Sequence, residues 1–142
     1  MDMLFWLLLG VILWIFVARA MPAKGVQTID TNALRNKLKQ KDIQFIDVRT
    51  RGEYEGNHIK QFQNIPLQTL KQSFHSLDPS KEIIVICQSG MRSMQAAKIL
   101  KKNGFEQITN VIGGMNQCRQ TNQRDFSNLL RSFFTAFLLR VM

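Results

Sequence analysis

The chain has 142 residues, which is enough for one ordinary domain with an attached segment and too few for a second globular domain. Its 19 lysines and arginines against 10 acidic residues give a formal net charge of +9, which favours contact with acidic surfaces. The 2 cysteines exclude a disulfide scaffold, and neither their spacing nor the nearby histidines indicate a zinc site. We therefore expect no metal and one reactive thiol in a reducing compartment.

Residues 3–18 carry no charge and are rich in Leu, Ile, Val, Phe and Trp. At about 1.5 Å per residue, a helix over this run is about 24 Å long, slightly less than the apolar thickness of a bilayer. Continued to Met21, just before Pro22, it approaches about 28 Å, which a mildly thinned membrane accommodates. Residues 1–21 are therefore expected to form a transmembrane anchor.

The charges around this segment favour an anchor over a cleaved signal peptide, the alternative that stays open. The small-x-small sequence at 18–20 has the form of a cleavage site, but the segment starts with Asp2 and has no basic region before its apolar run. Arg19 and Lys24 follow the run, so the positive-inside bias places the rest of the chain in the cytoplasm. We expect a single-pass protein of the cell membrane whose main domain faces the cytoplasm.

After a linker at 22–25, residues 26–118 alternate short apolar runs with helical patterns, which is typical of βαβ units and a mostly parallel sheet. The β-branched run at 83–86 is typical of a central strand buried on both faces. The sequence thus predicts an α/β domain with a sheet of about five strands. Strands are expected at 26–29, 43–48, around Ile65 and Pro66, at 83–86 and at 107–112; helices are expected after a cap at Asp30 or Thr31, over 67–74 and over 93–103.

Cys87 ends the most apolar strand, and the next helix follows after only a few residues. The thiol is thus expected at a strand's carboxyl end and a helix's amino end, where free backbone N–H groups and the helix dipole stabilise a thiolate. Gly90 lets the loop turn its N–H groups inward, as in an anion-binding nest. Arg92 adds a fixed charge, and Ser89 and Ser93 add hydroxyl donors. The loop therefore predicts a cysteine nucleophile that acts on a small anion.

Several motifs taken together resemble the rhodanese family, specifically its single-domain, membrane-anchored bacterial members. The resemblance covers residues 26–117, about two thirds of the chain. It implies a three-layer α/β/α sandwich around a parallel sheet. The motifs are Asp47-Val-Arg49, Glu53-Tyr54, Gly56-Asn-His58-Ile59, Asn64-Ile-Pro66, Cys87-Gln-Ser-Gly-Met-Arg92-Ser93 and Gly113-Gly-Met115.

The resemblance also implies a function. In this family, the cysteine that matches Cys87 takes a sulfane sulfur from a donor such as thiosulfate, holds it as a persulfide and passes it to cyanide or another thiophile. This implies a sulfurtransferase with Cys87 as its catalytic residue and without a metal or organic cofactor. The expected partners are a small anionic sulfur donor, a thiol or cyanide acceptor and, as a further option, a protein acceptor. The implied substrate-binding residues, of which Arg92 would hold the donor's anionic end, are Gln88, Ser89, Gly90, Met91, Arg92 and Ser93.

Other matched positions are expected to serve the fold. Asp47 and Arg49 end the second strand and are expected to pair with each other or with Glu53. His58 is interpreted as a turn residue rather than a general base. Cys118 lies where family members often have Trp, so an incidental small apolar residue is favoured over a resolving thiol.

Residues 119–142 depart from the family pattern, because apolar side chains recur there at the spacing of one helix face. Arg124, Arg131 and Arg140 flank this stripe, and basic charge in an apolar stretch favours lipid over nucleic acid, which is not expected as a partner. The basic amphipathic tail is expected to lie on an anionic membrane, pack against the domain or pair with a partner, in that order, unless it has no evolved role. The stripe consists of Phe126, Leu129, Leu130, Phe133, Phe134, Phe137, Leu138 and Val141.

Two rival functions stay open at this point. Related folds use a loop with Cys and Arg on tetrahedral oxyanions, so a phosphatase or an arsenate reductase is one rival. The other is a sulfur-relay or interaction module. Four residues separate Cys87 from Arg92, whereas cysteine phosphatases place five residues between them, and this shorter loop favours sulfur chemistry.

Overall fold

Five short strands form a parallel sheet in the computed structural model, which describes residues 2–20 and 25–141. The order across the sheet is β1-β5-β4-β2-β3, and every neighbouring pair is parallel. The predicted parallel sheet is thus confirmed. The strands are β1 (Val26–Ile29), β2 (Ile43–Asp47), β3 (Gln63–Asn64), β4 (Glu82–Ile86) and β5 (Ile108–Val111).

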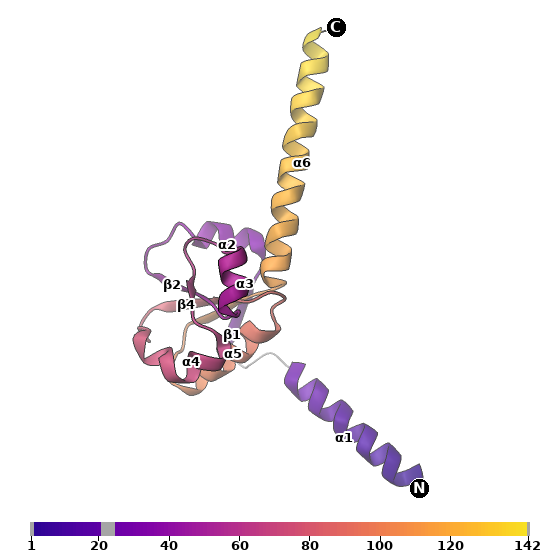
Figure 1. The fold of residues 1–142 in the computed structure, drawn as a ribbon, viewed down its shortest axis with the longest axis vertical. Helices are drawn as coiled ribbons and strands as arrows, with labels where there is room; N and C mark the ends of the chain where they lie inside the picture. Colours follow the sequence, from indigo (N-terminus) through magenta and orange to yellow (C-terminus); the bar gives the residue numbers. More distant parts are fainter. Residues whose placement is uncertain (1, 21–24, 142) are drawn as a thin grey trace.

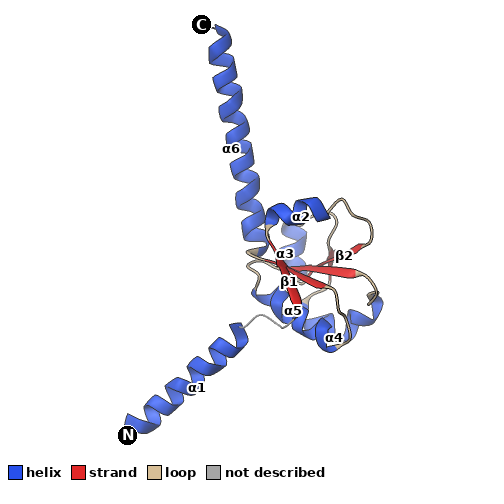
Figure 2. Ribbon diagram, turned by 180° about the vertical axis from the view of Figure 1, so that it is seen from behind, coloured by secondary structure: helices blue, strands red, loops and turns tan. Residues whose placement is uncertain are grey.

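Helices cover both faces of this sheet, which gives the predicted three-layer sandwich (Figures 1 and 2). One apolar cluster joins the sheet to α4 and α5, and a second joins the opposite face to α2 and the first turns of α6. The helices are α1 (Asp2–Ala20), α2 (Thr31–Lys37), α3 (Arg51–Gly56), α4 (Leu67–Ser73), α5 (Met91–Lys102) and α6 (Gly114–Val141), and a short 3₁₀ turn spans Phe74–Ser76.

The central strand β4 shows why the two clusters form. Ile83 and Val85 belong to the cluster under α4 and α5, whereas Ile84 and Ile86 belong to the cluster under α2 and α6. Successive side chains of a strand point to opposite faces, so a strand that is apolar at every position is stable only between two layers. All four side chains are fully buried, as the β-branched run predicts.

The structure corrects two elements of the prediction. The third strand is β3, two residues earlier than expected, because Pro66 has no N–H with which to extend a strand ladder. Helix α3 was not anticipated, although Thr50 and Glu53 form a capping box that satisfies its first N–H groups. The spacing of Thr and Glu in the sequence carries this signal.

The N-terminal segment forms helix α1, and every side chain from 3 to 17 is exposed. Within the described residues, no helix is long and apolar enough to cross a membrane, so the predicted transmembrane span is not found there. Of the expected linker at 22–25, residues 22–24 lie outside the described part of the chain.

Helix α6 runs without interruption through the expected boundary between residues 118 and 119 and extends far beyond the sheet (Figure 1). Its first half is tied to α2, because the Arg35 guanidinium donates to Asp125 Oδ2 and to Asn122 Oδ1, each at 2.5 Å. Phe126 and Leu129 beyond this tie are 63% and 54% exposed, so this part of the apolar stripe does not pack against the domain. The stripe's side chains from Phe133 onward lie outside the described set.

Candidate active site

Cys87 directly follows β4 and is completely buried, at the carboxyl edge of the sheet. Its Sγ accepts the N–H of Gly90 at 3.1 Å, and Ser93 Oγ lies 3.3 Å away as a second donor. Ser93 Oγ is also 3.1 Å from the Gly90 carbonyl, so its one proton serves the sulfur or the carbonyl at any moment. The loop therefore places two hydrogen-bond donors beside the sulfur.

Helix α5 begins immediately after this loop. Gly90 is its N-cap and has φ +100°, in the left-handed region that a residue with a Cβ rarely adopts. This turn aims the N–H of Gly90 back at the sulfur and brings Ser93, in the first turn of α5, beside it. The expected position of the thiol, between the end of a strand and the start of a helix, is thus found.

The first turn of α6 holds the other side of the loop. The N–H of Met115 donates to the Cys87 carbonyl at 2.9 Å, and the N–H of Asn116 donates to the Gln88 carbonyl at 3.0 Å. Gly114 has φ +53°, and a Cβ there would lie 2.8 Å from the carbonyl carbon of Gln88 and closer still to the Cys87 oxygen. Only glycine permits this approach, which accounts for the second glycine of the Gly-Gly-Met motif.

Replacing Gly114 with Ala is expected to destabilise the domain by about 1 to 3 kcal/mol, because the Cβ pushes α6 away from the cysteine loop and strains a left-handed residue. Urea unfolding measures this change. Gly52→Ala is the matched control, since a Cβ at Gly52 meets nothing within 4 Å and alanine is favoured in a helix. Equal stability of Gly114→Ala and the wild type would show that the close contact is not rigid.

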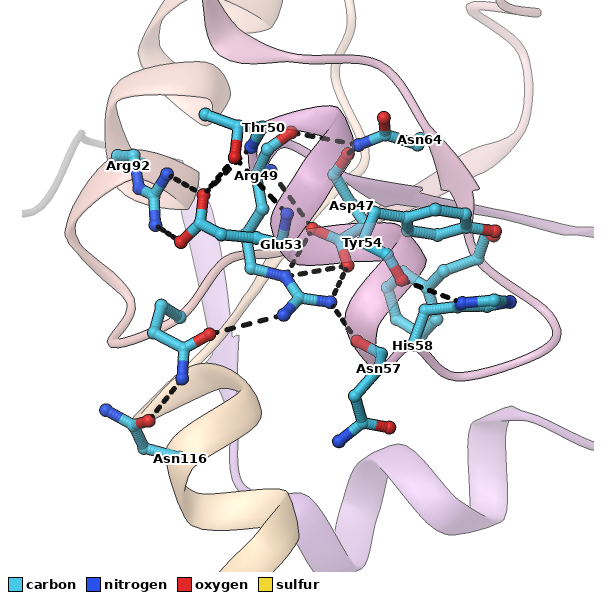
Figure 3. A network of polar contacts seen from close by, with 12 residues as sticks. Asp47, Arg49, Thr50, Glu53, Tyr54, Asn57, His58, Asn64, Arg92 and Asn116 are labelled. Carbon is cyan, nitrogen blue, oxygen red and sulfur yellow. Dashed lines mark hydrogen bonds and ion pairs between the residues drawn. The ribbon is translucent and has the colours of Figure 1, made fainter.

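A buried ion pair lies beside the cysteine loop (Figure 3). Asp47 and Arg49 are almost completely buried, and the Arg49 Nε lies 3.0 Å from both Asp47 carboxylate oxygens. The same guanidinium donates to the Asn57 carbonyl at 2.7 Å and to Gln88 Oε1 at 3.2 Å. Gln88 in turn donates to Asn116 Oδ1 on α6 at 2.5 Å. Asp47 and Arg49 thus pair with each other and link β2 to the cysteine loop.

Arg92 forms a second ion pair, with Glu53 of α3 (Figure 3). Its two terminal nitrogens lie 2.7 and 2.6 Å from the two carboxylate oxygens, in a bidentate arrangement. The Arg92 hydrogen bond, together with those from Thr50, lowers the pKa of Glu53 to about 2, and the Glu53 hydrogen bond raises the pKa of Arg92. Arg92, which is expected to hold the anionic end of the sulfur donor, is therefore already paired with the Glu53 carboxylate. Its role in binding a sulfur donor stays a prediction.

This ion pair predicts a pH dependence of stability. Because the folded pKa of Glu53 is about 2 and an unfolded Glu titrates near about 4.3, Glu53 adds stability above about pH 4.3 that is lost as the pH falls toward 2. Its side chain is 34% exposed, so solvent screening limits the effect to on the order of 1 kcal/mol.

The measurement is urea unfolding of the wild type and of Glu53→Gln between pH 2 and 7. The two stabilities are expected to differ at neutral pH and to approach each other as the pH falls toward 2, where Glu53 is about half protonated in the folded protein. Glu55→Gln, on the exposed side of the same helix, is the matched control and should change little. A difference between wild type and Glu53→Gln that stays constant over this range would contradict the assignment.

The other expected substrate-binding residues take different positions. Gly90 and Ser93 contact the sulfur, whereas Ser89 and Met91 are exposed at the surface. The Gln88 side chain binds Arg49 and the first turn of α6 rather than facing the sulfur. The structure thus brings together only part of the expected set around Cys87.

The remaining candidate residues serve the fold. His58 stacks on Tyr54 with ring centroids 4.0 Å apart, and its Nδ1 lies 2.9 Å from the Tyr54 carbonyl, as expected of a turn residue. Cys118 belongs to the cluster on the face of the sheet opposite to that of Cys87, and burial raises the pKa of its thiol. The sheet separates the two cysteines, so Cys118 is not placed to resolve a persulfide on Cys87.

Sequence reasoning missed the contribution of α6 to this site. Asn116 contacts the cysteine loop, and Arg119 lies on the wall of an adjacent pocket. The sequence places Arg119 in the predicted tail at 119–142. The sequence does carry a signal for Arg119. It lies four residues after Met115 of the Gly-Gly-Met motif, and residues at this spacing lie on the same face of a helix.

Comparison with known proteins decides the family. The family model described as the rhodanese-like domain matches residues 30–121. The chain belongs to the rhodanese-like domain family. It is 28% identical over 94 residues to the Vibrio cholerae thiosulfate sulfurtransferase GlpE, an alignment that covers 66% of this chain and 89% of that protein. Such relatives support sulfur transfer in general as the activity of this rhodanese-like domain.

Two further comparisons concern the extent and the fold of the domain. The chain is 36% identical over 94 residues to the putative sulfur carrier protein YrkF of Bacillus subtilis; this covers 66% of the chain and 51% of YrkF, so the chain spans about half of that relative. The crystal structure of a rhodanese-like domain protein from Staphylococcus aureus matches with a TM-score of 0.60 and 33% identity, covering 64% of this chain and 89% of that one. Each of these two alignments thus covers about two thirds of this chain.

Proposed function

We propose that this rhodanese-like domain is a thiosulfate-type sulfurtransferase that holds the transferred sulfur as a persulfide on Cys87. The observation that carries the proposal is the pair of donors beside Sγ, the N–H of Gly90 at 3.1 Å and Ser93 Oγ at 3.3 Å. A persulfide places its negative charge one atom beyond Sγ. Donors that lie close to this region stabilise such a charge.

In the first half of the reaction, the Cys87 thiolate attacks the outer, sulfane sulfur of thiosulfate. A bond forms between Sγ and that sulfur while the bond between the two thiosulfate sulfurs breaks, and its electron pair leaves with sulfite. The thiolate and thiosulfate thus yield a persulfide anion and sulfite. Because Cys87 is fully buried, the loop has to open to admit the donor.

In the second half, a thiophile attacks the outer sulfur of the persulfide. With cyanide, a carbon–sulfur bond forms, the Sγ–S bond breaks with its electrons on Sγ, and thiocyanate leaves. The donors that held the persulfide charge then hold the Cys87 thiolate again. The cycle needs no external oxidant or reductant, because each half exchanges one bond to sulfur for another.

The length of the loop supports sulfur chemistry over its oxyanion rivals. Four residues lie between Cys87 and Arg92, one fewer than in cysteine phosphatases. A shorter ring converges on one atom beside the sulfur, whereas a phosphoryl or arsenate group needs donors for three oxygens.

The test is incubation with thiosulfate followed by intact-mass measurement, together with steady-state transfer to cyanide. We expect one added sulfur atom on the wild type and on Cys118→Ser, the matched control, and none on Cys87→Ser. Hydrolysis of an activated phosphate ester and thiol-dependent arsenate reduction are measured on the same preparation. Efficient turnover in either of these assays with negligible sulfur transfer would overturn the proposal.

A sulfur relay to a protein acceptor is the second candidate, and the printed name of YrkF, a putative sulfur carrier protein, favours it. Both candidates share the persulfide on Cys87 and differ in the acceptor. Rapid discharge of the loaded protein by cyanide or by small thiols supports the sulfurtransferase. A persulfide that these acceptors do not discharge supports the relay.

We further propose that α1 attaches the chain to the cell membrane with the rhodanese-like domain on the cytoplasmic face. The support is the apolar surface of α1, on which Met3, Trp6 and Trp14 are each more than 65% exposed in the free chain. Exposed apolar surface of this extent is unfavourable in water and favourable in lipid. The positive charges of Arg19 and Lys24 support the orientation.

Carbonate washing of membranes from cells that express the full chain tests the attachment. The full chain is expected to stay in the pellet, and a variant without residues 1–21 is expected in the wash, because burial of the α1 side chains supplies the binding energy. Membrane binding that survives the deletion would assign attachment to the stripe on α6. A soluble product of the full-chain gene that begins near Met21 would indicate signal cleavage instead.

A further inference from the structure

A pocket of about 290 Å³ lies beside the cysteine loop. Helix α3 contributes Glu53 to its wall, the loop contributes Gln88, and α6 contributes Met115 and Arg119. Two of these residues touch the cysteine itself, since Gln88 follows it in the chain and the N–H of Met115 binds its carbonyl. The pocket thus adjoins the backbone that carries the thiol.

The charges around this pocket are unequal. Arg49 also lines it, but the buried Asp47 carboxylate neutralises its charge, and Glu53 is neutralised by Arg92. The Arg119 side chain makes no hydrogen bond or ion pair with any residue in the part of the chain that the structure describes. One positive charge on this wall is therefore free to bind an anion.

The size of the pocket indicates which kind of anion fits it. At about 290 Å³, the pocket is larger than a five-atom thiosulfate ion needs. Polar side chains of Asn57 and Gln88 line the same space, so hydrogen-bonding groups of an organic molecule find partners there. The pocket therefore suits a small polar organic anion.

We propose that this pocket binds an anionic low-molecular-weight thiol as the sulfur acceptor, with the acceptor's carboxylate on Arg119. The inference rests on the proposed function and names the residue that selects the acceptor. The thiolate of the acceptor attacks the outer sulfur of the Cys87 persulfide anion, a sulfur–sulfur bond forms, and the bond to Sγ breaks with its electrons on Cys87. The products are the acceptor's persulfide anion and the Cys87 thiolate.

Two matched probes test the role of Arg119. N-acetylcysteine carries a carboxylate, and N-acetylcysteine amide replaces it with a neutral group of the same size. Arg119→Ala is expected to raise the KM for N-acetylcysteine about tenfold, the effect of losing one charge-assisted contact, and to leave the KM for the amide unchanged. Arg119→Lys is expected to keep most of the preference for the acid.

Arg51→Ala is the control variant, because Arg51 is an exposed arginine on α3 that pairs with Glu55 outside the pocket. It is expected to change neither KM. Transfer to cyanide and the loading of Cys87 by thiosulfate are measured on the wild type, Arg119→Ala and Arg51→Ala, so that an effect on the donor step is separated from an effect on the acceptor. Equal effects of Arg119→Ala on the acid and the amide, or an effect on thiosulfate loading alone, would overturn the assignment.

Binding of N-acetylcysteine to the unloaded full chain, followed by NMR titration, separates this inference from the proposed function. If the wild type takes no sulfur from thiosulfate, the proposed function fails. The titration still shows whether the pocket binds the anionic thiol through Arg119. Weaker binding to Arg119→Ala than to the wild type or Arg51→Ala supports it. Equal binding to all three proteins overturns it.

Discussion

The geometry of this site depends on the contact between the first turn of α6 and the carbonyl groups of Cys87 and Gln88. Two N–H groups at the start of a helix have no partner within the helix, and here they bind the two carbonyls that follow β4. Gly114 makes the approach possible, because any Cβ would collide with the loop. With its carbonyls bound on the outside, the loop directs the N–H of Gly90 toward the sulfur.

The two ion pairs around the loop differ in burial and therefore in consequence. Asp47 and Arg49 are buried and linked to further hydrogen bonds, so removing one partner leaves an uncompensated charge in the interior. Glu53 and Arg92 are about one-third exposed, so their pair breaks at a lower cost when another anion competes. The buried pair of Asp47 and Arg49 thus supports the loop, whereas separating Arg92 from Glu53 costs less.

Sequence patterns predicted most of the sandwich because each pattern reflects local chemistry. The continuous β-branched run of β4 requires burial on both faces, and Asp30 caps α2 through the N–H of Ala33, as the sequence indicated. The expected place of Cys87 followed from the order of strand, loop and helix. The sequence patterns predicted short elements less accurately. They did not indicate α3 despite its capping box, and they placed β3 two residues too late, because Pro66 ends the ladder.

The sequence by itself determined the sheet, the cysteine loop and the number of residues between Cys87 and Arg92, because these depend on neighbours along the chain. Only the tertiary structure decided which charges meet. Arg92 pairs with Glu53, 39 positions away, and Arg119 joins a pocket whose other walls come from α3 and the loop. Such contacts arise where parallel strands bring distant segments to one edge of the sheet, and no local pattern records which side chains meet there.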